Sequence, residues 1–270
     1  MFYRVSVYYT YMQEYAVVTG ATSGIGLEFA RLFASDGVSL VLVARGKAEL
    51  EQVAKELRDS FAVDVHVLSA DLAKMQDVEE VVTYTTQHQL PVQYLINNAG
   101  QGDFGNFIDG SWQKELGMIH LNVVALTYLS KKYGAQFAKR GSGHIVNVAS
   151  TTAFRPGPLM AVYVATKSYV LHFSEAIATE LHKHGVKVTA LCPGPTASKF
   201  QEAAAMSESK LVKGKRLPTA AQVARYGYKA MRRGRVVAIH GTGNKLGVYA
   251  VRILPRRTVR VLAHRAHRVK

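Results

Sequence analysis

Two residues able to exchange a proton stand four positions apart in the stretch Tyr-Val-Ala-Thr-Lys at 163–167, and a hydroxyl, Ser150, precedes them. In a helix, positions i and i+4 lie on one face, so Tyr163 and Lys167 would point into the same space. An ammonium stabilises a phenolate, and we therefore expect the pKa of Tyr163 to fall from about 10 toward neutrality. Such a phenol could supply the acid/base step in interconverting a carbonyl and an alcohol, with Ser150 polarising the carbonyl. The Y-x-x-x-K pattern alone is weak, and a solvated helix face is its ordinary alternative.

A glycine-rich turn is the second candidate site. The sequence T-G-A-T-S-G-I-G at 19–26 follows a short apolar run at 14–19 and precedes a helical pattern of apolar residues. Gly20, Gly24 and Gly26 would let the backbone turn tightly and approach a pyrophosphate, which the helix N-terminus attracts. Strand, glycine turn and helix in this order predict a dinucleotide site, with a plain turn as the alternative.

The residues at the end of the second expected strand, 38–43, bear on which dinucleotide binds. They are Ala44 and Arg45, about 20 residues past the glycine turn. An acidic residue here would bind the ribose 2′-hydroxyl of NAD, whereas an arginine suits a 2′-phosphate. One charge-assisted contact of about 1.5–3 kcal/mol gives roughly a tenfold to hundredfold preference. The sequence therefore predicts NADP(H), and the alternative is an exposed surface arginine.

The elements that position these residues alternate between strands and helices. Further strands are expected at 63–68, 92–96, 145–148 and 186–191, with helices at 47–57, 77–88 and 111–140 and a helix carrying Tyr163. This alternation predicts a single-domain α/β fold, a Rossmann-type doubly wound parallel sheet with helices on both faces. Ligands bind at the carboxyl edge of such sheets. The residues expected to line that edge are Gly20, Arg45, Asp71, Asn98, Ser150 and Pro193.

Composition narrows the class of protein. The chain has 270 residues, 48% hydrophobic and 20% charged, which is ordinary for one globular α/β domain. Its single Cys192 excludes an intrachain disulfide and fits a reducing compartment. No apolar run approaches transmembrane length, and no signal-peptide pattern is present. The ten histidines have no paired spacing typical of a metal site. We expect a cytoplasmic protein without a metal.

The net charge of +15 is concentrated at one end of the chain. Of the 34 Lys and Arg residues, 17 lie in 209–270 with no Asp or Glu, which leaves 17 basic against 19 acidic residues in the rest. Pro255 predicts short amphipathic helices on either side of it. This charge could hold the protein peripherally on an anionic membrane or attract an acidic carrier. Nucleic acid is disfavoured because no reader motif is present, and solvated arginines above a packed apolar face are the plain alternative.

Over roughly residues 14–240 the chain resembles the short-chain dehydrogenase/reductase superfamily. It is most similar to the DltE-like bacterial branch, in which V-A-R, G-H-I-x-N, A-V-Y-x-A-T-K and C-P-G-P-T recur. We accordingly divide the chain into an N-terminal extension, an NADP-binding domain and a basic amphipathic tail, at 1–13, 14–240 and 241–270. The extension is expected to be disordered, with an added edge strand as the alternative.

The resemblance implies a role for each catalytic residue. Tyr163 would be the acid/base. Lys167 would lower the pKa of Tyr163 and hold the nicotinamide ribose. Ser150 would orient the carbonyl, and Asn122 would anchor a water in a proton relay from Lys167.

The resemblance also implies the cofactor contacts. Asp71 and Leu72 would contact adenine. Asn98 and Ala99 would contact the adjacent ribose, and Thr196 the carboxamide. The full implied cofactor-binding set is Gly20, Thr22, Ser23, Gly24, Ile25, Gly26, Arg45, Asp71, Leu72, Asn98, Ala99, Gly100, Tyr163, Lys167, Pro193, Gly194, Thr196 and Ser198.

Three positions affect how fully the roles implied by the resemblance apply to this sequence. Asn97 is more structural than ligand-binding in the superfamily. Gly46 stands where a second arginine is frequent, which would weaken the grip on a 2′-phosphate. Ser198 stands where threonine is usual and would still offer a hydroxyl to the phosphates.

The function expected is an NADP(H)-dependent oxidoreductase that reduces an apolar ketone, aldehyde or 3-oxoacyl group, or runs the reverse reaction, as a homodimer or homotetramer. The alternative is a non-catalytic nucleotide sensor or anionic-surface binder on the same fold, which would not need the whole Asn-Ser-Tyr-Lys set. Apolar residues in three loops suggest an apolar substrate, although such residues pack locally at least as often. They are Phe104, Phe154, Pro156, Met160, Phe200 and Met206.

Overall fold

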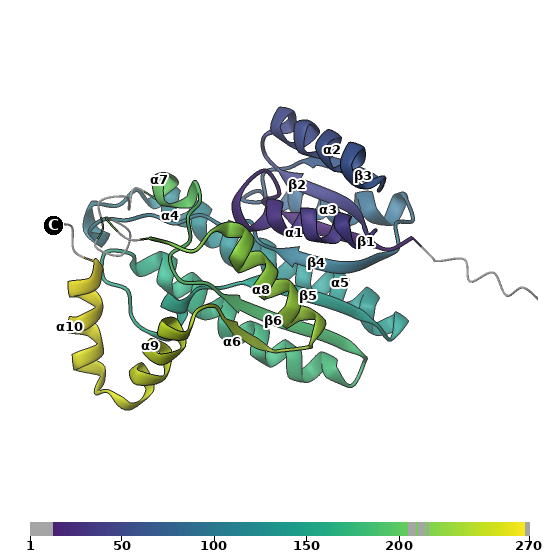
Figure 1. Cartoon of the computed structure of the whole chain (residues 1–270). Helices are drawn as coiled ribbons and strands as arrows, with labels where there is room; N and C mark the ends of the chain where they lie inside the picture. Colours follow the sequence, from purple (N-terminus) through teal and green to yellow (C-terminus); the bar gives the residue numbers. More distant parts are fainter. Residues whose placement is uncertain (1–12, 205–208, 210–213, 215, 268–270) are drawn as a thin grey trace, which may run out of the picture.

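The computed structural model of the chain describes residues 13–204, 209, 214 and 216–267 (Figure 1). Within them lies one sheet of seven parallel strands in the order β3-β2-β1-β4-β5-β6-β7. The strands are β1 (Tyr15–Thr19), β2 (Ser39–Ala44), β3 (Val65–Ser69), β4 (Val92–Asn97), β5 (Gly143–Val148), β6 (Val186–Cys192) and β7 (Val237–Ile239). From β1 the sheet grows outward to β3 and then resumes at β4 on the other side of β1. This reversal of winding direction marks the point where ligands bind in doubly wound sheets.

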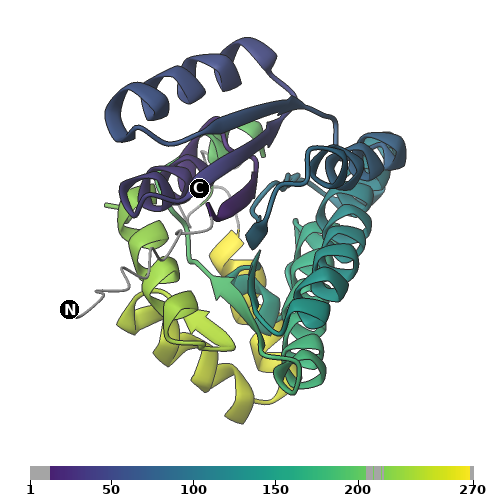
Figure 2. The ribbon, with the colours of Figure 1, turned by 90° about the vertical axis from the view of Figure 1, so that its right-hand side faces the viewer.

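Helices cover both faces of the sheet (Figure 2). The α-helices of the described residues are α1 (Gly24–Ser35), α2 (Lys47–Phe61), α3 (Met75–Gln87), α4 (Trp112–Ile119), α5 (Leu126–Arg140), α6 (Ala161–His182), α7 (Phe200–Ala203), α8 (Ala220–Arg232), α9 (Thr242–Ile253) and α10 (Arg256–His267). In β1, Ala16 and Val18 pack into the core under α1, α2 and α8, whereas Tyr15 and Val17 pack into the core under α3, α5 and α6. Strands covered on both faces require continuous apolar runs, which is why these segments lack polar alternation. The expected fold class is confirmed.

The stretch predicted as one helix over 111–140 differs in the structure. A π-helical segment, His120–Ala125, separates α4 from α5 and holds the buried Asn122. The Asn122 amide is bonded to the backbone of the neighbouring strand-end loop, so its position is set by a tertiary contact that periodicity does not reveal. Helix α8 and strand β7 were also not predicted from the sequence.

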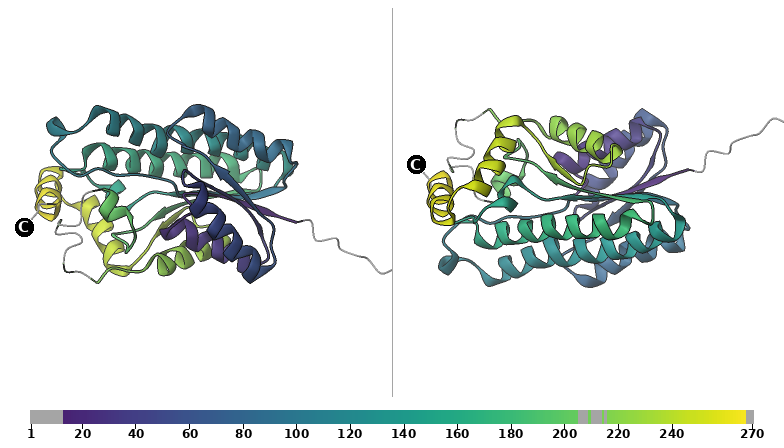
Figure 3. Two further views of the ribbon diagram at one scale, coloured as in Figure 1. Left: turned by 90° about the horizontal axis from the view of Figure 1, so that it is seen from above. Right: turned by 90° about the horizontal axis from the view of Figure 1, so that it is seen from below.

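The C-terminal segment forms α9 and α10 on either side of Pro255, which confirms the two short helices expected there. Val248 of α9 and Val259 and Ala263 of α10 are buried against the rest of the molecule. Both helices lie at the end of the molecule that also carries α7 (Figures 1 and 3). The expectations for residues 1–12 lie outside the described residues, and the proposed boundary at 240 stays a prediction.

Candidate active site

A cavity of 1190 Å³ opens at the carboxyl edge of the sheet. It is lined by the turn after β1, the ends of β2, β4, β5 and β6, the first turns of α6, and α9. Of the residues predicted from sequence, those lining it are Gly20, Thr22, Ser23, Gly24, Ile25, Arg45, Asp71, Leu72, Asn98, Ala99, Gly100, Ser150, Tyr163, Lys167, Pro193, Gly194, Thr196 and Ser198. Gly26 and Asn122 stand behind the wall and support it.

The glycine turn after β1 has no room for side chains. Gly20 has φ of +65°, and a Cβ there would lie 2.8 Å from Asn98 Nδ2. A Cβ on Gly26 would collide with the Gly20 carbonyl oxygen and with Asn98 Nδ2. Only glycine fits both positions, and the bare backbone is what lets a pyrophosphate come close to the start of α1. The turn therefore fits a dinucleotide.

Thr19, which the sequence analysis did not single out, holds this turn to β4. Its Oγ1 accepts hydrogen bonds from the backbone N–H of Asn98 (3.0 Å) and Ala99 (2.9 Å) and donates to Ile96 O (3.2 Å). The Asn98 Nδ2 in turn donates to the carbonyl oxygens of Thr19 (2.9 Å) and Gly20 (3.1 Å). The signal available in the sequence was a hydroxyl as the last residue of a strand, directly before the first glycine.

Arg45 lies exposed at the β2 end of the cavity. Glu49, from the first turn of α2, lines the same end, and its carboxylate lies against Gly46, where a Cβ would collide with it. No ion pair joins Arg45 to an acid among the described residues. A 2′-phosphate here would meet one attractive charge, Arg45, and one repulsive charge, Glu49. Gly46 therefore weakens phosphate binding in two ways: it lacks a second arginine, and it leaves the space that the Glu49 carboxylate occupies.

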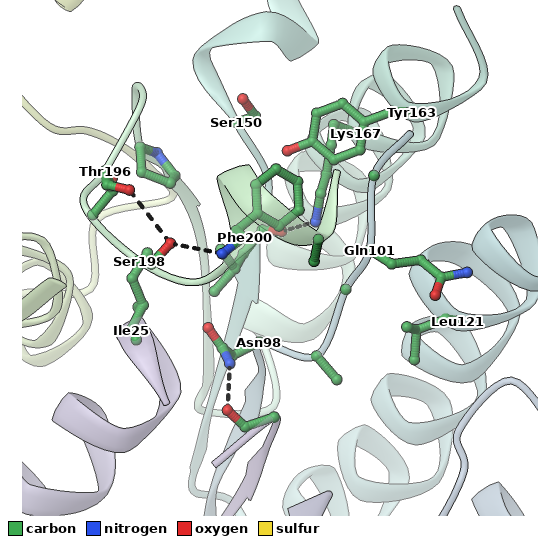
Figure 4. Close-up of a pocket in the computed structure, with 18 of the residues that line it drawn as sticks. Ile25, Asn98, Gln101, Leu121, Ser150, Tyr163, Lys167, Thr196, Ser198 and Phe200 are labelled. Atoms are coloured by element: carbon green, nitrogen blue, oxygen red, sulfur yellow. Dashed lines mark hydrogen bonds between the residues drawn. The ribbon is translucent and has the colours of Figure 1, made fainter. Parts of the chain in front are cut away.

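The three catalytic candidates meet at the centre of the cavity (Figure 4). Lys167 Nζ lies 5.9 Å from the centre of the Tyr163 ring and donates to Val148 O at 2.7 Å. Ser150 Oγ accepts hydrogen bonds from Thr152 N (3.1 Å) and Thr152 Oγ1 (2.9 Å). With both acceptor sites of Ser150 used, its O–H is its remaining hydrogen-bonding group, and in the protein alone it is directed to the Tyr163 hydroxyl.

The pKa values of the pair differ from the expectation. Burial raises the pKa of Tyr163 to about 12, opposed in part by a hydrogen bond with Ser150. Burial lowers the pKa of Lys167 to about 8, and the nearby Cys192 side chain opposes this shift in part. The predicted fall in the Tyr163 pKa is therefore wrong for the protein alone. Spacing places the two groups on one helix face, but it does not reveal the loss of water around them.

Asn122 is brought beside Lys167, as the resemblance implied. A Cβ on Gly100 would lie 3.2 Å from Asn122 Oδ1 and 3.4 Å from Lys167 Nζ, so both flank that glycine. The Asn122 amide is bonded to residues around it at both its nitrogen and its oxygen. Its Nδ2 donates to Gln101 O (2.9 Å) and Thr166 Oγ1 (3.0 Å), and its Oδ1 accepts from Gln101 N (3.0 Å). Asn122 thus fixes the loop after β4, and a relay water remains a prediction.

A doubly wound parallel sheet with a side-chain-free glycine turn and a buried tyrosine–lysine pair defines a dinucleotide-dependent oxidoreductase site. The chain belongs to the short-chain dehydrogenase family, whose model matches residues 14–209.

Individual relatives agree with this assignment. The chain is 34% identical over 195 residues to a putative ketoacyl reductase of Streptomyces coelicolor, covering 70% of this chain and 74% of the relative. Two solved structures are similar. A short-chain dehydrogenase from Sphingobium yanoikuyae in complex with NADPH has a TM-score of 0.79 and 31% identity, covering 88% of this chain and 93% of the other. A bulky-bulky ketone specific alcohol dehydrogenase from Comamonas testosteroni has a TM-score of 0.76 and 32% identity, with coverages of 88% and 91%.

The superfamily and the oxidoreductase class expected from the sequence are confirmed. The narrower DltE-like branch and the role of each site residue remain predictions. In the part of the chain that the structure describes, no helix is both long and apolar enough to cross a membrane. Over the same residues, no group of three or more His, Cys, Asp or Glu side chains is placed to hold a metal ion.

Proposed function

We propose that the protein is an NADP(H)-dependent carbonyl reductase, or the reverse alcohol dehydrogenase, with Ser150, Tyr163 and Lys167 as its catalytic residues. The observation that supports this most is the buried tyrosine–lysine pair with the Ser150 hydroxyl bonded to the tyrosine, all in the cavity that contains the glycine turn. A cavity of 1190 Å³ has room for a dinucleotide together with a substrate.

Bound NADPH would supply the hydride, and the chain supplies position and a proton. Ser150 donates a hydrogen bond to the carbonyl oxygen and orients it. Tyr163, protonated at neutral pH because burial raises its pKa, gives its proton to the same oxygen as the alcohol forms. Lys167 then favours the transient phenolate by its charge, and Tyr163 recovers a proton from solvent.

The cofactor is NADP(H). Arg45 at the end of β2, without an ion-pair partner among the described residues, suits a 2′-phosphate, and the similar Sphingobium enzyme is a complex with NADPH. Glu49 beside it moderates the preference over NADH.

The substrate is an apolar ketone, aldehyde or 3-oxoacyl compound. The Phe200 ring lies 5.5 Å from the Tyr163 ring, and buried Met160 packs in the same cluster, so the reacting end of the cavity is apolar. The ketoacyl reductase and the bulky-ketone alcohol dehydrogenase among the relatives support this class. Met206, which the sequence analysis also placed at the mouth, lies outside the described residues.

The test is NADPH oxidation in the presence of bulky ketones, aldehydes, 3-oxoacyl thioesters and steroid ketones. Tyr163→Phe should lower kcat by about 100-fold or more, the usual effect of losing a positioned acid, while NADPH binding measured by fluorescence persists. Tyr169→Phe is the matched control, because Tyr169 lies on the exposed side of the same helix and should leave kcat unchanged. If the wild-type protein binds NADPH but reduces no compound in this panel, the result would favour the non-catalytic alternative.

We also propose that this cytoplasmic enzyme makes reversible contact with an anionic membrane through α9 and α10. Leu246, Tyr249 and Ile253 share one face of α9 and are 73%, 62% and 84% exposed. Arg252 lies in the same helix, α10 carries further exposed arginines, and no acidic residue occurs anywhere in 209–270. Exposed apolar side chains beside uncompensated positive charge complement an anionic lipid surface. The homodimer or homotetramer typical of the superfamily remains a prediction.

A further inference from the structure

Arg155 is a charged residue of the cavity wall that the proposed chemistry does not use. It follows the short 3-10 helix Thr151–Phe154 that begins after Ser150, and it lines the cavity. Its Nη1 is out of contact with solvent and has no hydrogen-bond partner among the described residues. Its Nη2 lies 3.3 Å from Nε2 of His267, the last described residue of α10.

No charge neutralises Arg155. It makes no ion pair with any acid in the described part of the chain. His267 is not a charged neighbour either, because its Nδ1 lies 2.7 Å from Pro158 O and must donate there, which leaves Nε2 as the acceptor for Arg155. Burial lowers the pKa of Arg155, yet a guanidinium remains charged in proteins. A half-buried cation with an unsatisfied N–H is unfavourable until an anion meets it.

We propose that Arg155 binds a carboxylate carried by the substrate, so that the enzyme's natural substrates are oxo acids, or the corresponding hydroxy acids, with an apolar portion. The proposal rests on the reductase function argued above, because Ser150 and Tyr163 define where the carbonyl lies. The planar guanidinium presents parallel N–H groups that match the two oxygens of a carboxylate.

The distance along the cavity wall suits one small molecule that contacts both Ser150, through its carbonyl group, and Arg155, through its carboxylate. Arg155 is five positions after Ser150, and at about 2 Å per residue in a 3-10 turn their backbones lie about 10 Å apart or less. The apolar Phe154 and Met160 line the cavity in the same region. The glycine turn follows β1, whereas this wall follows β5, with β4 between them, so the carboxylate would bind about 10 Å from the place of the pyrophosphate.

The plain alternative is that Arg155 only anchors α10 through His267. In that case its loss would affect every substrate alike through disorder of the C-terminal helix. A carboxylate-binding role predicts instead an effect confined to anionic substrates, so the two roles separate in a comparison of matched charged and neutral ketones.

The experiment uses the full-length enzyme with NADPH and a series of aryl oxo acids, PhCO(CH2)nCO2⁻ with two to five methylene groups, each beside its neutral methyl ester. For the preferred length, wild type should show a kcat/KM for the acid about tenfold to hundredfold above that for the ester, mostly through KM. Arg155→Met should remove this advantage and change the ester by less than about threefold. Arg155→Lys should retain part of it.

Two controls identify the cause. Arg257→Met removes an equally charged but exposed arginine of α10 and should keep the full preference for the acid. His267→Phe removes the contact to Arg155 while leaving the guanidinium, and should lower thermal stability but keep the ratio of acid to ester.

Two results would overturn the carboxylate site while the reductase function stands. One is an equal fall of kcat/KM for acid and ester in Arg155→Met, and the other is a wild type with equal kcat/KM for acid and ester at every length. If no ketone is reduced, the reductase function fails, and calorimetric titration with 3-benzoylpropionate decides the site by itself. Binding that Arg155→Met abolishes supports the site, and binding that is absent or unchanged overturns it.

Discussion

Lys167 carries a positive charge in a place that disfavours it. The side chain is 5% exposed, its one hydrogen bond in the described structure is to Val148 O, and burial lowers its pKa to about 8. In the unfolded chain the same group titrates near 10.5. Burying the Lys167 ammonium therefore destabilises the folded state. The chemistry at Tyr163 needs this buried charge, whereas the fold itself does not need it.

Lys167→Met should abolish turnover and stabilise the ligand-free protein. Each unit of pKa shift corresponds to 1.36 kcal/mol, and loss of the Val148 contact offsets part of it, so we expect a gain of about 1–3 kcal/mol at pH 7. Because the folded pKa lies below the unfolded one, the unfolded chain binds more protons between pH 8 and 10.5, and the wild type recovers stability as pH rises through this window. The advantage of the variant should shrink accordingly.

Urea denaturation of both proteins at pH 7 and pH 10 measures this difference. Lys183→Met, an exposed lysine at the end of α6, should change stability by no more than about 0.5 kcal/mol at either pH. A Lys167→Met protein less stable than wild type at pH 7 would contradict the cost assigned to the buried charge.

Arg45 and Glu49 should act in opposite directions on the NADP(H) preference. Arg45→Ala removes the attraction and should raise KM for NADPH about tenfold or more with little change for NADH. Glu49→Gln removes the repulsion of the 2′-phosphate while keeping the shape of the side chain, and should lower KM for NADPH. The decrease should be only severalfold, because Glu49 is exposed and solvent screens its charge. Steady-state kinetics with both cofactors decide the point, and an NADPH preference unchanged in Arg45→Ala would place the 2′-phosphate elsewhere.

At the scale of residues, the sequence was sufficient where strand ends and helix periodicity determine position. Gly20, Ser150, Tyr163 and Lys167 all line one cavity for that reason. It was insufficient where function depends on burial or on partners distant in the chain. The raised pKa of Tyr163 and the contact of Arg155 with His267, 112 positions away, are of this second kind.

At the scale of elements, the glycine turn between β1 and α1 is a rigid unit tied to β4. Gly26→Ala would drive a Cβ into the Gly20 carbonyl and the Asn98 amide, which cannot move without releasing Thr19. We expect loss of NADPH binding by tenfold or more and a destabilisation of about 1–3 kcal/mol from overpacking.

Fluorescence titration with NADPH and thermal unfolding measure the two effects. Gly105→Ala is the matched control, since a Cβ there meets nothing within 4 Å. NADPH affinity and melting temperature both equal to wild type in Gly26→Ala would show that the turn relaxes easily and is not built for close approach.

Elements that the sequence analysis missed share a physical cause. Strand β7 has three residues, too few for a pattern of burial to stand out. Helix α8 carries a complete capping box between Thr219 and Gln222, a local signal that could have located its start. The break between α4 and α5 has no such signal, because Asn122 gains its partners only when the loop after β4 folds beside it.

At the scale of the whole molecule, the basic segment and the cavity meet at one end. Helix α9 contributes Asn244, Val248 and Val251 to the cavity wall and turns Leu246, Tyr249 and Ile253 outward. Val259 and Ala263 hold α10 against the body, so removing the segment would disturb the fold together with the charge. The membrane proposal therefore needs substitutions on exposed positions only.

Arg256→Glu, Arg257→Glu and Arg260→Glu together reverse three exposed charges of α10. At about 1 kcal/mol for each basic residue near an anionic surface, this variant should lose most binding to phosphatidylserine-containing vesicles in cosedimentation at low salt. Reduction of a small neutral ketone should be retained, because none of the three lines the cavity. Wild-type binding should itself fall steeply as salt rises from about 0.05 to 0.5 M.

The matched control is Lys131→Glu, Lys139→Glu and Lys183→Glu, two exposed lysines of α5 and one directly after α6, which change the net charge equally. If binding follows total charge alone, both triple variants lose it together and no docking face exists. If the face formed by α9 and α10 is the contact, the control stays bound to the vesicles. The double variant Leu246→Asp with Ile253→Asp should then lose vesicle binding although it keeps every arginine, because membrane affinity there depends on apolar insertion beside the arginines.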